Sequence, residues 1–169
     1  MGLPQRTEAA PYYFTYIDLI SGDDILQTLE AQLADTSRFL SGISEEKSVY
    51  RYAPDKWSIR QVIGHVNDTE RVFAFRAMWF ARGLSEPLPS FDQNIASNAD
   101  GADDRSLASH IQEFRKIREA TIALFRNLPA EAWVRSGVAS GNSVTVNALA
   151  YMIAGHVAHH AAILRERYL

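Results

Sequence analysis

The chain has 169 residues and a formal net charge of -3, from 17 Lys and Arg against 20 Asp and Glu, so no net positive field attracts nucleic acid. It contains no cysteine, which excludes disulfides and thiolate ligands and leaves imidazole, carboxylate or water to bind a transition metal. A hydrophobic fraction of 47% suits one globular domain over residues 1–169, and no stretch approaches the roughly 18 apolar residues of a membrane span, so we expect a cytoplasmic protein without a membrane partner.

Four segments carry apolar residues every three to four positions, the spacing typical of helices packed on one face. They cover residues 24–40, 58–83, 107–128 and 144 to the C-terminus. The second begins with Ser58 and Gln61, the spacing of a capping box. No segment alternates like a strand, so the predicted class is all-α, a four-helix bundle, with the aromatic residues 12–16 packed on it.

The link between the second and third predicted helices, residues 84–104, is long for a bundle, where connections usually take about 2 to 8 residues. Its length allows it to carry the chain back along the bundle, so that these two helices could run parallel. Long loops in compact domains are often functional, and this one could cover the mouth of the bundle as a lid. A plain surface crossover is the alternative.

Three of the five histidines lie close together, at His156, His159 and His160. At about 100° per helical residue, His160 projects roughly 40° from His156, while His159 projects roughly 60° to the other side. His156 and His160 therefore lie in the middle of the apolar stripe, spaced one turn apart as in a metal clamp or in a pair that hydrogen-bonds inside the core. His65, on the apolar face of the second helix, is the candidate third ligand. If the two helices are neighbours, three neutral imidazoles leave coordination positions open, as expected of a catalytic ion.

Other polar residues near these positions have two interpretations each. His110 could be a fourth ligand or a core histidine bonded to the backbone. Asp68 could accept a hydrogen bond from a ligand histidine or act as a general base, whereas Glu70 projects about 140° from His65, toward solvent or another helix. Arg76 could bind an anionic group of a substrate or pair with a carboxylate.

Residues 56–65 (KWSIRQVIGH), followed later by residues 156–160 (HVAHH), resemble the DinB/YfiT-like superfamily, as do residues 88–91 and 155–166. The resemblance implies an up-down-down-up four-helix bundle with a long crossover after the second helix, frequently a homodimer. It also implies three metal-binding histidines, which fall on His65, His156 and His160. Many members follow the double histidine with Arg-Gly-Gln, and residues 161–163 are AAI here, so no further polar role carries over.

These observations predict a metal-dependent enzyme with a divalent transition metal such as Zn, Ni, Mn or Fe and a small-molecule substrate. Some relatives are transferases of a low-molecular-weight thiol such as bacillithiol, mycothiol or glutathione, and others are described as metal-dependent hydrolases. The absence of cysteine suits both reactions, because the thiol would be a cosubstrate. The alternative is a non-catalytic bundle that binds a metal or a small ligand in stress response or regulation.

Overall fold

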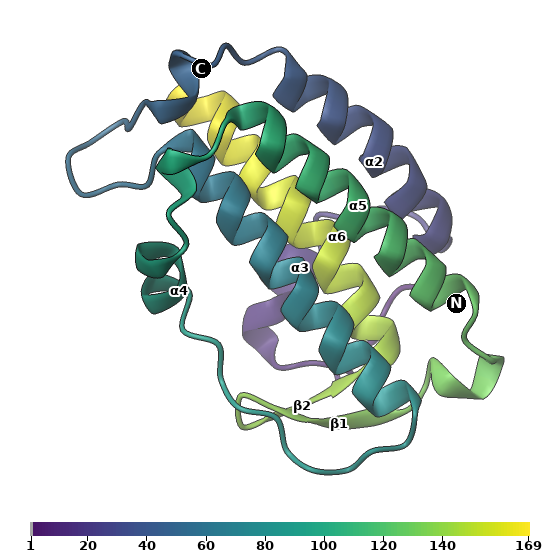
Figure 1. The fold of residues 1–169 in the computed structure, drawn as a ribbon. Coiled ribbons are helices and arrows are strands. Elements are labelled where there is room, and N and C mark those ends of the chain that lie inside the picture. The colour runs from purple at the N-terminus through teal and green to yellow at the C-terminus, as the bar shows by residue number, and fades with distance from the viewer. Residues whose placement is uncertain (1) are drawn as a thin grey trace.

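A computed structural model describes residues 2–169 and is mostly helical (Figure 1). The four long helices coincide with the four predicted segments to within a few residues, and they are α2 (Ile25–Ser41), α3 (Ile59–Ala81), α5 (Leu107–Arg126) and α6 (Val146–Ile163). Two short helices, α1 (Phe14–Ile17) and α4 (Gln93–Ala99), bring the described helices to six and were not predicted as separate elements. The predicted four-helix bundle is thus correct for the four long helices, but it did not include the two short ones.

The long helices begin where side chains cap their free backbone N–H groups. Ser58 accepts from the backbone N–H of Gln61, and the Gln61 side chain accepts from the N–H of Ser58, so the predicted capping box is confirmed. The side chains of Asp24, Ser106 and Thr145 each accept a backbone N–H in the first turn of α2, α5 and α6. Local sequence therefore sets where each long helix starts.

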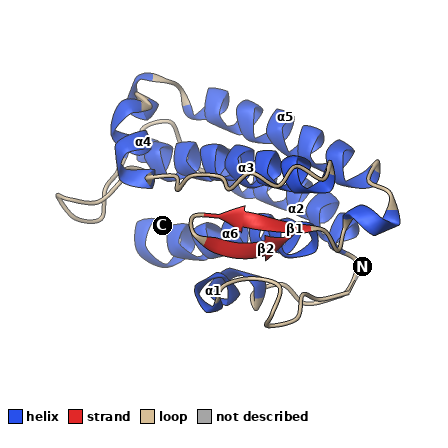
Figure 2. Cartoon of the chain, turned by 90° about the horizontal axis from the view of Figure 1, so that it is seen from below, coloured by secondary structure: helices blue, strands red, loops and turns tan. Residues whose placement is uncertain are grey.

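The prediction that no segment forms a strand was wrong. Strands β1 (Ser136–Ala139) and β2 (Asn142–Thr145) pair antiparallel, with Ser136 opposite Thr145 and Ala139 opposite Asn142 (Figure 2). Ser140 and Gly141 make the turn with φ of 53° and 75°, the left-handed backbone that tight hairpins require. Four-residue strands are too short to show an alternating pattern, and their pairing depends on the turn.

Helix α6 lies at the centre of the molecule, and every residue from Val146 to Val157 is buried. It packs against α3, α1 and α2, and the hairpin leads directly into its first turn (Figures 1 and 2). The aromatic N-terminal segment packs on the bundle as predicted, because α1 lies against α6 with Phe14 and Ile17 buried. A helix enclosed over most of its length shows little amphipathic periodicity; His156 lies in its buried part, and His159 and His160 are half-buried.

A buried ion pair joins α3 to α5. Arg118 donates from Nε and Nη2 to the two carboxylate oxygens of Glu70, each at 2.8 Å, and from Nη1 to Gln32 of α2 at 3.0 Å. Glu70 was expected to face solvent or another helix, and it faces α5. Because a buried charge without its partner is strongly unfavourable, this contact fixes how three helices meet.

The crossover from α3 to α5 runs along the hairpin and then forms α4 beside α3 (Figure 1). The backbone N–H of Leu88 donates to the carbonyl of Val138 at 2.9 Å, and that of Ser140 donates to the carbonyl of Leu88 at 3.1 Å. The crossover is therefore attached to the rest of the molecule by backbone hydrogen bonds before α4 begins.

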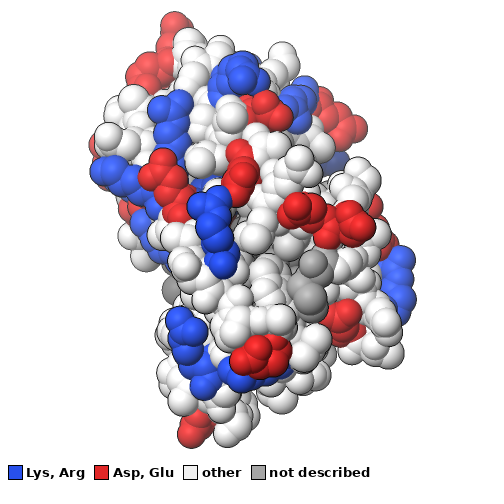
Figure 3. Space-filling model, turned by 90° about the vertical axis from the view of Figure 1, so that its right-hand side faces the viewer, with Lys and Arg blue, Asp and Glu red and all other residues white. Residues whose placement is uncertain are grey.

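The surface charge and the length of the apolar helices bear on binding to nucleic acid and to membranes. On the face drawn in Figure 3, Lys and Arg side chains alternate with Asp and Glu, so that face presents no block of positive charge. Among residues 2–169, no helix combines the length and the apolar character needed to cross a membrane.

Gly155→Ala is expected to lower the free energy of unfolding by about 1–3 kcal/mol, because a Cβ at this position would clash with the backbone carbonyl of Tyr16 and push α1 away from α6. Urea unfolding measures the change. The control is Gly42→Ala at the exposed end of α2, where a Cβ makes only an ordinary contact at 3.4 Å with the carbonyl oxygen of Phe39. Equal stability of the two variants would show that the close approach of α1 is not required.

Candidate metal centre

Three imidazoles from α3 and α6 converge at one point in the bundle. Nε2 of His65 lies 3.0 Å from Nε2 of His156, which lies 3.1 Å from Nε2 of His160. Within residues 2–169 these are the one group of three or more His, Cys, Asp or Glu residues whose potential ligand atoms all lie within 4.8 Å of one another. The structure thus brings together the three histidines selected from the sequence.

The geometry suits an ion better than hydrogen bonds between the rings. An imidazole nitrogen has one in-plane site, either an N–H or a lone pair, so Nε2 of His156 cannot form good hydrogen bonds to both neighbours. Around an ion about 2.0–2.1 Å from each nitrogen, adjacent nitrogens at octahedral or tetrahedral angles lie about 2.9–3.4 Å apart. The observed separations of 3.0 and 3.1 Å fall in that range.

Burial keeps these rings neutral, the state that a metal ligand requires. It lowers the pKa of His65 to about 4 and that of His160 to about 3, with smaller contributions from neighbouring histidines. The pKa of His156 also falls well below its ordinary value, first because of burial and then because of the charges of His160 and His65. Near neutral pH each of the three rings is therefore neutral and can present one nitrogen lone pair to an ion.

The other two histidines lie outside this group. The His159 ring packs edge-on against Tyr16, with 5.3 Å between ring centroids, and burial lowers its pKa. His110 is fully buried, and its Nε2 lies 2.9 Å from the carbonyl oxygen of Ala102. The structure therefore places His110 as a core histidine with a backbone partner and away from the three converging rings.

The structure does not place Asp68 beside His65. Asp68 accepts from Arg71 at 3.2 Å, whereas the group next to Nδ1 of His65 is the hydroxyl of Thr69, at 3.4 Å. Thr69 stands one helical turn after His65 and so lies above it on the same face, while Asp68 is rotated away. The i, i+4 spacing in the sequence would have identified Thr69 as the nearer group.

A cavity of about 150 Å³ lies beside His65 and His156. Its walls are mainly aromatic, with Arg76 and a few neutral polar groups, and the residues that line it are Tyr12, Tyr13, Tyr16, His65, Thr69, Val72, Phe73, Arg76, Phe91, Gln93, Ser140 and His156. Tyr12 and Gln93 are exposed, so the cavity reaches solvent on their side. The N-terminal segment and the crossover, and not only the long helices, thus form the walls of the site.

A second cavity of about 260 Å³ reaches the site beside His160. Trp57, whose ring centroid lies 4.9 Å from that of His65, is in its wall, together with Asn94. Gln93 lines the first cavity and Asn94 the second, so the beginning of α4 stands between them. Sequence reasoning did not identify this division, because only the fold brings α4 to the histidines.

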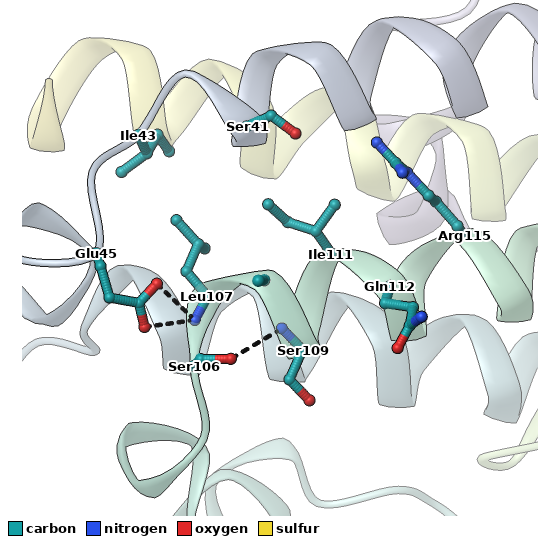
Figure 4. A pocket seen from close by; sticks show the side chains of 10 residues that line it. Ser41, Ile43, Glu45, Ser106, Leu107, Ser109, Ile111, Gln112 and Arg115 are labelled. Carbon is teal, nitrogen blue, oxygen red and sulfur yellow. Dashed lines mark hydrogen bonds between the residues drawn. The ribbon is translucent and has the colours of Figure 1, made fainter.

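A larger cavity, about 660 Å³, lies between the end of α2 and the start of α5, where its ten lining residues include no histidine (Figure 4). Both carboxylate oxygens of Glu45 accept from the backbone N–H of Leu107, at 2.9 and 3.1 Å, and so cap α5. Its acidic group is thus already used for helix capping. Size alone therefore does not identify the functional site, and the cavities at the histidines are the better candidates.

Comparison with protein families assigns residues 28–164 to the DinB superfamily, which is most of the chain, and this protein belongs to that family. Its fold is similar to that of YfiT from Bacillus subtilis, described as "a probable metal-dependent hydrolase with an unusual four-helix bundle topology", at 17% identity and a TM-score of 0.70 over 96% of this chain and 89% of that one. It is also similar to a mycothiol-dependent maleylpyruvate isomerase, at 15% identity and a TM-score of 0.70. That match covers 86% of this chain and 61% of the isomerase. Comparison with curated protein sequences gives no significant match.

The metal-free protein is expected to lose stability as the pH falls below about 6.5. Histidines of the unfolded chain bind protons near pH 6.5, whereas His65 and His160 do so only at about 4 and about 3 in the folded protein. Between these values the unfolded state holds more protons, so the free energy of unfolding falls by up to ~1.4 kcal/mol per pH unit for each histidine. Above pH 6.5 these rings contribute no pH dependence.

Urea unfolding of the chelator-treated protein at several pH values from 5 to 8 measures this slope. The control is His65→Gln, which removes one of the buried titrating rings and should make the slope shallower. A free energy of unfolding that is constant from pH 7 to pH 5 would contradict the burial of neutral imidazoles.

Proposed function

We propose that His65, His156 and His160 bind one divalent transition metal and that the protein is a metal-dependent enzyme acting on a small molecule. The observation that carries the proposal is the position of His156 Nε2, which faces two other imidazole nitrogens at 3.0 and 3.1 Å and cannot hydrogen-bond well to both. An ion between the three rings would use all three lone pairs.

An enzyme is favoured over a purely structural metal site because cavities reach the ligands. Structural metal sites are usually closed by four protein ligands, whereas catalytic sites keep a position open. A metal held by three neutral histidines lowers the pKa of water or of a thiol, and so supplies a nucleophile near neutral pH. The protein's own groups would hold the reactants, with aromatic walls that exclude water and the Thr69 hydroxyl orienting His65.

Transfer of a low-molecular-weight thiol is the first candidate reaction. Such a reaction brings two small molecules to one ion, and two cavities approach the histidines from the two sides of the start of α4. The mycothiol dependence of the similar isomerase is in keeping with this choice. Hydrolysis by activated water is the second candidate, in keeping with the description of YfiT.

We also infer that the whole chain is one domain in the up-down-down-up order of its family. The contact of Asn67 with His110 and that of Glu70 with Arg118 support parallel α3 and α5, because both partners advance together along the chain. A homodimer is proposed from the family resemblance alone, and light scattering that finds a monomer at high concentration would refute it.

Single alanine substitutions of His65, His156 and His160 should each abolish stoichiometric metal binding, since removal of one ligand leaves two. His159→Ala is the matched control, because it removes the adjacent ring that packs on Tyr16 and should keep the metal. Elemental analysis of the purified proteins measures the metal content. A His159→Ala protein without metal beside a His160→Ala protein with metal would refute the ligand assignment.

Activity should depend on the same ion. Bacillithiol, mycothiol and glutathione are each combined with a set of electrophiles, and ester and amide substrates are added without a thiol, before and after metal removal. We expect at least one pairing to proceed only with the metal and to be lost in His160→Ala. A metal-bearing protein inert with every pairing would favour the non-catalytic alternative, a bundle that binds a metal or a small ligand.

A further inference from the structure

Two arginines are buried among residues 2–169, Arg118 and Arg76, and their surroundings differ. Arg118 has a carboxylate partner, Glu70, which neutralises its charge inside the bundle. Arg76, with 4% of its surface exposed, forms no ion pair with a carboxylate of the described residues. A buried charge normally has a partner of opposite sign, so the absence of one at Arg76 calls for an explanation.

The partners that Arg76 does have are neutral. Its Nη2 donates to the backbone carbonyl of Pro89 at 2.9 Å and to the hydroxyl of Ser140 at 3.0 Å. Burial lowers the pKa of the guanidinium, and the neighbouring Tyr13 opposes this in part. Tyr13 also forms a side-chain hydrogen bond with Arg76, and a guanidinium has five N–H donors, so these three bonds do not use all of them. The side chain is thus held in place by the crossover, the hairpin turn and Tyr13 of the N-terminal segment.

Arg76 also forms part of the wall of the 150 Å³ cavity at the histidines. Its Cζ lies 5.9 Å from the centroid of the Phe73 ring, which in turn lies 6.2 Å from the centroid of the His156 ring. One aromatic ring therefore separates the guanidinium from the converging imidazoles. A molecule in this cavity could contact the cation at one end and approach the histidines with the other.

The volume of the cavity and the single positive charge of Arg76 limit which molecules could bind there. A cavity of about 150 Å³ is enough for one benzene ring, and Tyr13, Tyr16 and Phe91 offer aromatic surface to it. One guanidinium neutralises one negative charge, which a carboxylate carries, whereas a phosphate group carries up to about two near pH 7. A second cation for such a group is not among the residues that line this cavity.

We infer that Arg76 is the binding residue for the carboxylate of a small substrate whose body, no larger than one ring or a short carbon chain, occupies the cavity beside His65 and His156. The catalytic role of this binding rests on the proposed function, the metal-dependent reaction at the histidines. The carboxylate replaces the missing counter-charge of Arg76, and a salt bridge with the remaining N–H groups orients the rest of the molecule toward the histidines.

The test measures binding without metal, so that a carboxylate cannot bind through an ion. Calorimetric titration of the chelator-treated protein uses benzoate, phenylacetate and 3-phenylpropionate, each beside its neutral amide. At least one carboxylate should bind about tenfold or more tightly than its amide. Arg76→Gln should weaken that binding by about 10- to 100-fold, the usual value of hydrogen bonds to a charged group, and leave the amide unchanged.

The matched control is Arg82→Gln, the same substitution at an exposed arginine that follows α3, and it should bind the carboxylate like the unchanged protein. If Arg76→Gln does not fold, Arg76→Lys keeps the charge and should keep the preference for the carboxylate. Equal affinity for every carboxylate and its amide, or unchanged carboxylate affinity in a folded Arg76→Gln protein, would overturn the inference. Because the metal is absent, either result leaves the proposed metal chemistry to its own tests.

Discussion

The contact between three neutral imidazole nitrogens is the constraint on which the rest of the site depends. His156 lies between His65 and His160 at distances that require α3 and α6 to keep a fixed register and separation. The rings can approach so closely only if they are neutral imidazoles, because imidazolium cations buried side by side would repel strongly. Burial by the surrounding helices supplies this condition by lowering the pKa of all three rings.

Other contacts of the bundle support this arrangement from a distance. The Arg118 and Glu70 pair joins α5 to α3 in the turn that follows His65, and Gln32 connects α2 to both Arg118 and the backbone carbonyl of Ala154. Gly155, next to His156, lets the carbonyl of Tyr16 approach α6 where a side chain would prevent it. The two sides of the histidine cluster are thus held by polar contacts and by close packing, so the three rings are preorganised.

The residues that would hold a metal lie on α3 and α6, whereas the wall that would face a substrate combines Arg76 of α3 with segments from elsewhere in the fold. The histidines lie on the long helices, which packing keeps rigid, whereas the cavity walls are completed by the N-terminal segment, the hairpin turn and the crossover. Loops tolerate change better than core helices do. The segments that complete the wall could therefore change while the three histidines stay in place.

The sequence by itself determined the four long helices, the capped start of α3 and the i, i+4 placement of His156 and His160 on one face, because these depend on local spacing along a helix. Its alternatives also included another helix for Glu70 and a backbone partner for His110, and the structure shows both. The hairpin, α4 and the contact of Thr69 with His65 in place of Asp68 were decided by the tertiary structure. So was the absence of an ion pair at Arg76 within residues 2–169, since whether a charge is buried and what faces it depend on segments far apart in the chain.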